Sequence, residues 1–157
     1  MVRVLVWDEG VEMGPAVAAA LSGLPGVAIT LTGPADPDQG TSPAALAEAG
    51  VVVWWGGAVT ATSLTDRAAR RVVAAVTDRG LGFLTLSVGF PGKPVRILFE
   101  GVPPPAPKGE VRGTRGKGRV CWIGDLSAST KISAPGNAGL LRSAVLWCAG
   151  LDAAPVG

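Results

Sequence analysis

The sequence predicts an α/β fold in three layers, with a mostly parallel sheet that carries helices on both faces. Strand-like and helix-like blocks alternate along the chain. The strand-like blocks are near-continuous runs of Val, Ile and Leu, which is typical of strands that are buried on both faces. A length of 157 residues fits one domain, so we expect one domain over residues 1–157.

Turn and capping residues delimit the elements of the first half. Pro43 follows Ser42, a good capping residue, and proline is common at the first position of a helix, so a helix begins there and closes on Gly50. Apolar runs bounded by turn residues give the other elements. These are, in chain order, strand Val2–Trp7, helix Gly14–Leu24, strand Val27–Gly33, loop Asp36–Ser42 and a third strand from Val51.

The clearest helix occupies Ser63–Gly80, with Ser63 or Thr65 as its cap and Gly80 at its end. Its apolar stripe consists of Leu64, Ala68, Val72 and Val76. The rest of the chain follows the same alternation of periods. It predicts strand Leu81–Gly89, a short helical turn within 90–101, an irregular proline-rich segment Val102–Gly109, a hairpin with its turn at Arg115–Gly118 and a final helix Ser133–Gly150.

Two adjacent tryptophans, Trp54 and Trp55, end the third strand, and Gly56 and Gly57 follow them. Successive side chains of a strand point to opposite faces, so in a covered sheet each indole can pack under a helix. The alternative is that one indole lines a cleft at the end of the strand, which is where open α/β sheets bind ligands.

Composition excludes several kinds of chemistry. The chain has no histidine and no tyrosine, so a triad with a histidine base, a histidine metal site and a histidine pH switch are excluded. We interpret Cys121 and Cys148 as small core residues, and we expect no metal and no cofactor. A net charge of +2 makes nucleic acid an unlikely partner. No apolar run is long enough to span a bilayer, so we expect a cytoplasmic protein without a membrane partner.

The order of motifs resembles the trehalose-utilisation (ThuA-like) family. The segments that carry this resemblance are "VRVLVWDEG", "VVVWWGG", "GLGFLTLSVG", "GKGRVCWIG" and "LLRSAVLWCAG". The resemblance covers most of the chain, with a shortened segment around Gly101 to Lys108. It implies the class I glutamine amidotransferase-like fold, which is flavodoxin-like, and an activity on carbohydrates.

The chain departs from this family at the positions where the resemblance implies histidines. The residues at or near these positions are Glu12, Gly57, Thr60, Ser87 and Ser127. Because the histidines are replaced throughout, the resemblance carries over the fold but not the family's chemistry. The chain keeps the Trp-Trp-Gly-Gly turn but lacks the histidines that the resemblance implies at this turn.

Polar residues at the expected strand ends are the candidate ligand-binding groups. Asp8, Glu9 and Glu12 follow the first strand, and Asp125 follows the late hairpin strand. Carboxylates there can bind sugar hydroxyls, or act as acid and base if their pKa values are pushed apart. The alternative is that they are loop residues, some of which cap the helix near Gly14.

Ser87 lies near the end of the predicted fourth strand, where the wider fold carries a cysteine nucleophile, but it lacks an activating base. Glu9 and Ser87 are therefore weak catalytic candidates. The candidate binding residues are Asp8, Glu9, Glu12, Trp55, Gly56, Gly57, Ser87 and Asp125. The basic hairpin Lys108–Arg119 is either a solvated turn or a contact for an anionic partner.

Three functions remain open on the sequence alone. The favoured one is a degenerate, non-catalytic member of the family that binds a small polyol-like or carbohydrate-like ligand or a protein partner, with a homo-oligomer as a possibility. The second is a carbohydrate-modifying enzyme that uses Asp8, Glu9 and Glu12 in the cleft. The third is an anion-contacting protein that works through the basic hairpin.

Overall fold

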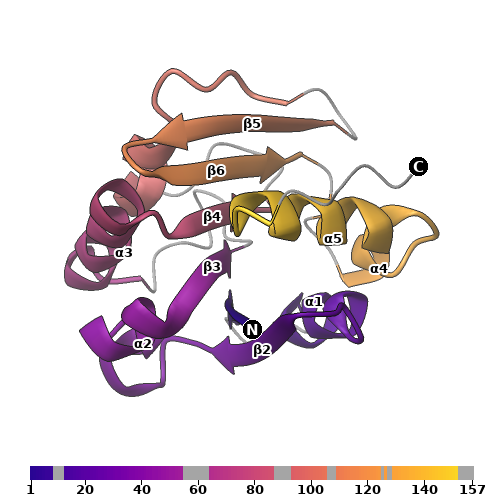
Figure 1. Cartoon of the computed structure of the whole chain (residues 1–157), viewed down its shortest axis with the longest axis horizontal. Helices are drawn as coiled ribbons and strands as arrows, with labels where there is room; N and C mark the ends of the chain where they lie inside the picture. The colour runs from indigo at the N-terminus through magenta and orange to yellow at the C-terminus, as the bar shows by residue number, and fades with distance from the viewer. Residues whose placement is uncertain are drawn as a thin grey trace.

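The computed structural model describes residues 1–8, 13–54, 64–86, 93–105, 109–124, 126 and 129–151, and it contains a six-stranded sheet in the order β2-β1-β3-β4-β6-β5 (Figure 1). The neighbouring pairs from β2 to β6 are parallel, and the β5–β6 hairpin is antiparallel. The strands are β1 Val2–Trp7, β2 Val27–Thr32, β3 Ala49–Trp54, β4 Gly82–Thr85, β5 Glu110–Arg115 and β6 Gly118–Ile123. The mostly parallel α/β architecture is therefore confirmed.

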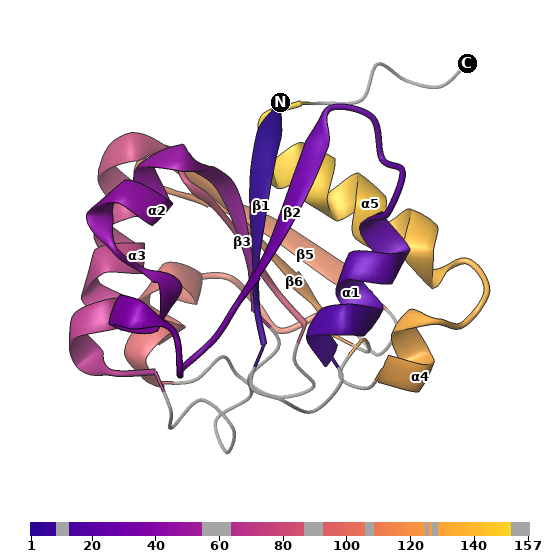
Figure 2. The ribbon, with the colours of Figure 1, turned by 90° about the horizontal axis from the view of Figure 1, so that it is seen from below.

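Helices cover both faces of the sheet, so that the sheet forms the middle of three layers (Figure 2). One face carries α1 Met13–Leu21, α4 Ser129–Ile132 and α5 Asn137–Cys148. The other carries α2 Pro43–Glu48, α3 Asp66–Arg79 and the 3-10 helix η3 Lys93–Phe99. Because side chains alternate along each strand, the core divides into two clusters, one on each face. This arrangement is flavodoxin-like, as expected.

Helix α3 begins and ends where its capping residues predict. The hydroxyl of Thr65 accepts a hydrogen bond from the Ala68 amide at 3.1 Å, so Thr65 is the cap rather than Ser63. Gly80 ends the helix with φ +84, a left-handed conformation that favours glycine. The predicted apolar stripe of α3 is buried against the sheet.

Two predicted helix ends were wrong. Helix α1 ends at Leu21 rather than Leu24, because the Leu24 amide bonds back to the Leu21 carbonyl in a tight turn. Helix α2 ends before Gly50, which lies inside β3. A Cβ atom on Gly50 would come within 2.5 Å of Val2 Cγ1, so this glycine allows a close approach between strands.

The last predicted helix begins later than expected, and a separate short helix, α4, lies before its predicted range. Pro135 and Gly136 separate α4 from α5, and Gly136 has φ +85, so α5 begins at Asn137 rather than Ser133. The predicted loop Asp36–Ser42 contains a short 3-10 turn, η1 Pro37–Gly40. In the part of the chain that the structure describes, no helix combines the length and apolar character needed to cross a membrane.

Candidate functional site

The candidate site lies at the carboxyl edge of the sheet. Trp7, Trp54, Thr85 and Trp122 are ladder partners in one row, at or next to the carboxyl ends of β1, β3, β4 and β6. Helix α1 follows β1 on one face and α3 follows β3 on the other, so the chain changes direction between β1 and β3. Such switch points are where open α/β sheets bind ligands.

Asp8 lies directly after β1 at this edge. Its amide extends the β1–β2 ladder by donating to the Thr32 carbonyl at 2.6 Å. A Cβ atom on Gly14 would lie 2.6 Å from Asp8 Cγ, so the carboxyl group packs against the first turn of α1. A negative charge is stabilised there by the helix dipole, which agrees with the predicted alternative that this carboxylate supports the helix terminus.

Asp8 also lines a cavity of about 360 Å³ with the loop that follows β2. Asp36 lines the same cavity, and its Oδ2 accepts hydrogen bonds from Thr32 Oγ1 and the Gly33 amide, both at 2.9 Å. Asp36 was not among the residues predicted to form the site. Its position three residues after a strand-ending glycine is a typical signal for an aspartate that closes a turn.

The other predicted site residues lie outside the described residues. They are Glu9, Glu12, Trp55, Gly56, Gly57, Ser87 and Asp125. Their convergence with Asp8 therefore stays a prediction. Among the described residues, no group of three or more Cys, Asp or Glu side chains could hold a metal ion.

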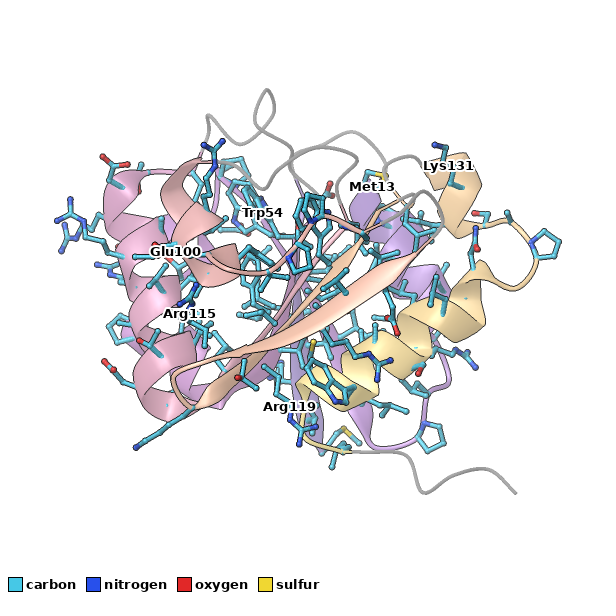
Figure 3. All side chains as sticks on the ribbon, turned by 90° about the horizontal axis from the view of Figure 1, so that it is seen from above. Met13, Trp54, Glu100, Arg115, Arg119 and Lys131 are labelled. Atoms are coloured by element: carbon cyan, nitrogen blue, oxygen red, sulfur yellow. The ribbon has the colours of Figure 1, made fainter. Side chains whose placement is uncertain are left out.

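Trp54 is a core residue at this edge, as predicted for one of the two tryptophans. It is 2% exposed and packs in the cluster under α3. Its ring lies 6.5 Å from that of Trp7 and 6.1 Å from that of Phe83, both within the range of favourable aromatic pairs. Trp54 lies at the same end of the molecule as Met13, the first residue of α1, while Arg119 lies at the opposite end (Figure 3).

Two buried polar atoms in this row have no hydrogen-bond partner in the described structure: Trp54 Nε1 and Thr85 Oγ1. Trp54 and Thr85 are direct ladder partners on neighbouring central strands, so their side chains leave the same face of the sheet. A buried donor without a partner costs about 1–3 kcal/mol. This pair could not be predicted from the sequence, because it depends on the register between β3 and β4.

The basic hairpin is held by contacts within the chain. Arg112 forms an ion pair with Glu110 at 2.8 Å. The guanidinium groups of Arg112 and Arg119 each lie 5.1 Å from the centre of the Trp147 ring. Arg115 donates to the Glu100 carbonyl at 2.6 Å. These contacts favour a structural role for the three arginines over an anion-binding role.

Cys121 and Cys148 are buried free thiols, as expected for small core residues. The Cys121 thiol donates to Glu110 Oε2 at 3.5 Å. A hydrogen bond with the Cys148 thiol, burial and the nearby Glu110 carboxylate raise the pKa of Cys121 above its ordinary value. The thiolate is disfavoured, so Cys121 is a poor nucleophile at neutral pH.

This raised pKa predicts a loss of stability at alkaline pH. In the unfolded chain Cys121 ionises near its ordinary pKa of about 8.5, whereas in the folded protein it stays protonated. The stability that the protonated thiol contributes is thus fully present below about pH 8.5. Above that pH the free energy of unfolding falls by up to about 1.4 kcal/mol per pH unit. Denaturant titrations between pH 7.5 and 10 measure this slope, and Cys121→Ala should reduce it. An equal slope in the variant would contradict the assignment.

Comparison of the chain with protein-family models and with curated proteins finds no match. The resemblance to the ThuA-like family therefore rests on its motifs alone.

Proposed function

We propose that this protein is a non-catalytic, ThuA-like binding module that takes a small polyol-like or carbohydrate-like ligand at the carboxyl edge of its sheet. The observation that carries the proposal is the unpartnered pair Trp54 Nε1 and Thr85 Oγ1. Both atoms lie in the row that ends the central strands, beside the switch point between β1 and β3. A ligand oxygen that accepts from these donors removes their desolvation penalty on binding.

The surroundings of the pair favour a neutral ligand group. Trp54 packs among Trp7, Leu64 and Phe83, which are apolar and buried. Burying an ionised group in such a setting costs far more than burying a hydroxyl that gains a hydrogen bond. The indole N–H is a donor only, and the threonine hydroxyl both donates and accepts. A hydroxyl of a polyol or sugar satisfies both.

The absence of histidine from the sequence supports a binding role over a catalytic one. A hydroxyl needs a neighbouring base to act as a nucleophile at neutral pH. Asp8 packs on the first turn of α1 and helps to stabilise that helix terminus. Both points favour a site that recognises a ligand without transforming it.

A pair of threonine variants tests the proposal. Thr85→Val removes a buried hydroxyl without a partner, so we expect the ligand-free protein to keep or gain up to about 2 kcal/mol of stability. Thr41→Val is the matched control, because the Thr41 hydroxyl is also buried but donates to the Asp38 carbonyl at 2.8 Å. We expect this control to lose about 1 kcal/mol. Denaturant unfolding measures both values.

The same variants are then screened by thermal shift against sugars, polyols and sugar phosphates. A ligand at about 100 times its Kd adds about 2.7 kcal/mol to the wild-type stability. We expect Thr41→Val to keep that response and Thr85→Val to lose most of it. A response that survives in Thr85→Val, or the absence of any response in the wild type, would contradict the proposal.

A carbohydrate-modifying enzyme that works with carboxylates is the second candidate. The observation that favours it is that Asp8 and Asp36 line one cavity. This function requires measurable turnover of a glycoside panel, with a loss of about 100-fold or more in Asp8→Asn. Ligand binding without turnover would contradict the enzymatic function and would support the binding module.

A further inference from the structure

The two cysteines of the chain meet in the core, although they belong to different elements. Cys121 is on β6, and Cys148 is the last residue of α5. Helix α5 packs on β4 and β6 (Figure 1), and both side chains are buried in the core cluster of that face. The two thiols form a hydrogen bond, so their sulfur atoms are in contact. The sequence holds no other cysteine.

A glycine and the strand pairing place Cys148 against Cys121. Gly82 of β4 has no side chain, and a Cβ atom there would lie 2.9 Å from Cys148 Cβ, so the end of α5 rests directly on β4. Cys148 Sγ lies 3.8 Å from the Phe83 carbonyl oxygen. Leu84, the next residue of this strand, is the ladder partner of Cys121. The contact between the thiols therefore follows from the packing of α5 on β4 and from the register of β4 with β6.

One polar side chain connects this buried pair with solvent. Glu110, on the edge strand β5, accepts a hydrogen bond from the Cys121 thiol at 3.5 Å, and its side chain is 24% exposed. Cys121 Sγ is therefore one side chain away from water. A small, uncharged oxidant such as hydrogen peroxide can reach this sulfur when the Glu110 side chain rotates away, whereas a large or charged reagent would have to open the core.

We propose that Cys121 and Cys148 are a cross-linking site, at which hydrogen peroxide oxidises the two thiols to a disulfide between β6 and α5. In the first step the Cys121 sulfur attacks one oxygen of the peroxide. The S–O bond forms as the O–O bond breaks, and the released hydroxide takes the thiol proton and leaves as water. In the second step the Cys148 sulfur attacks the sulfur of the resulting sulfenic acid. The S–S bond forms as the S–O bond breaks, and the Cys148 proton leaves with the second water.

The surroundings of the pair favour a slow and lasting cross-link over a rapid sensor. The thiolate is the reactive form of cysteine, and the raised pKa of Cys121 keeps this thiol protonated, so the first step is slow. Rapid redox sensors have exposed thiols of low pKa. Once formed, the disulfide restricts the unfolded chain between the two cysteines and holds α5 on the sheet.

Peptide mapping of the folded wild type tests the cross-link directly. The protein is incubated with hydrogen peroxide for hours, its remaining thiols are alkylated under denaturing conditions, and it is digested with trypsin without reduction. Cleavage after arginine and lysine places Cys121 in the peptide 120–131 and Cys148 in the peptide that begins at Ser143. We expect these two peptides to be joined, and dithiothreitol to separate them. Two alkylated thiols, a disulfide between two copies of the same cysteine, or sulfinic acid without a cross-link would overturn the proposal.

Thermal unfolding gives a second readout. We expect the oxidised wild type to melt about 5–15 °C higher than the reduced protein, and dithiothreitol to reverse this shift. Cys148→Ala is the matched control: it leaves the Cys121 thiol without its partner, so peroxide should not raise the melting temperature of this variant. Circular dichroism confirms that the variant folds. A shift of equal size in Cys148→Ala, or no shift in a wild type that carries the cross-link, would contradict the role of the disulfide in holding α5 on the sheet.

Discussion

Phe83→Ala is expected to lower the free energy of unfolding by about 3–5 kcal/mol, because a large ring would leave the centre of the core under α3. Phe83 is 2% exposed on a central strand. Its ring lies 6.1 Å from that of Trp54 and 6.0 Å from that of Phe99, so it joins the aromatic residues of β3 to those of η3. The melting temperature of a domain of this size should fall by roughly 6–20 °C.

Leu98→Ala and Ile97→Ala serve as a control pair for Phe83→Ala. They are neighbours on η3, but Leu98 is fully buried and Ile97 is 53% exposed. We expect about 2–5 kcal/mol for Leu98→Ala and less than about 0.5 kcal/mol for Ile97→Ala. Similar losses of unfolding free energy for the two variants would mean that the buried cluster under α3 does not supply the stability that we assign to it.

Gly118→Ala is expected to cost about 3 kcal/mol, at the upper end of the range for overpacked sites. A Cβ atom on Gly118 would lie 2.6 Å from the carbonyl oxygens of both Val76 and Leu81. These are backbone atoms at the end of α3 and the start of β4, so they cannot rotate away as a side chain can. The start of β6 would have to move off its neighbours.

Gly113→Ala, in the same hairpin, is the matched control for Gly118→Ala. The nearest atom to its added Cβ is Val102 Cγ2 at 3.1 Å, which belongs to a side chain that can adjust. Denaturant unfolding should therefore show a change below about 1 kcal/mol for this variant. A loss at Gly113 as large as that at Gly118 would show that flexibility of the hairpin backbone, and not contact with α3, requires glycine there.

The elements that were predicted correctly have local causes. The ends of α3 follow from a threonine cap and a left-handed glycine, which act within a few residues of each other. Gly50 misled the prediction, because its role is a contact with Val2, distant in sequence, and a glycine after a helical pattern is typical of a helix end. Sequence periodicity carries no information on such contacts.

The candidate site was predicted only in part for the same reason. Asp8 is at the expected strand end, since a strand boundary can be found in the sequence. The Trp54–Thr85 pair depends on which strands become neighbours and in which register, and neither follows from local sequence. Unpartnered atoms become visible only when the packing around them is known.

Helix α5 determines when one face of the sheet is fully covered during synthesis. Its residues cover β3, β4 and β6 on the face that includes Val53, Leu84 and Cys121. Because α5 follows all six strands in the chain, the ribosome releases β3, β4 and β6 before their cover on that face exists. Nascent chains that stop short of α5 would expose a broad apolar surface to chaperones and to one another, so this protein should depend on rapid completion of translation for its solubility.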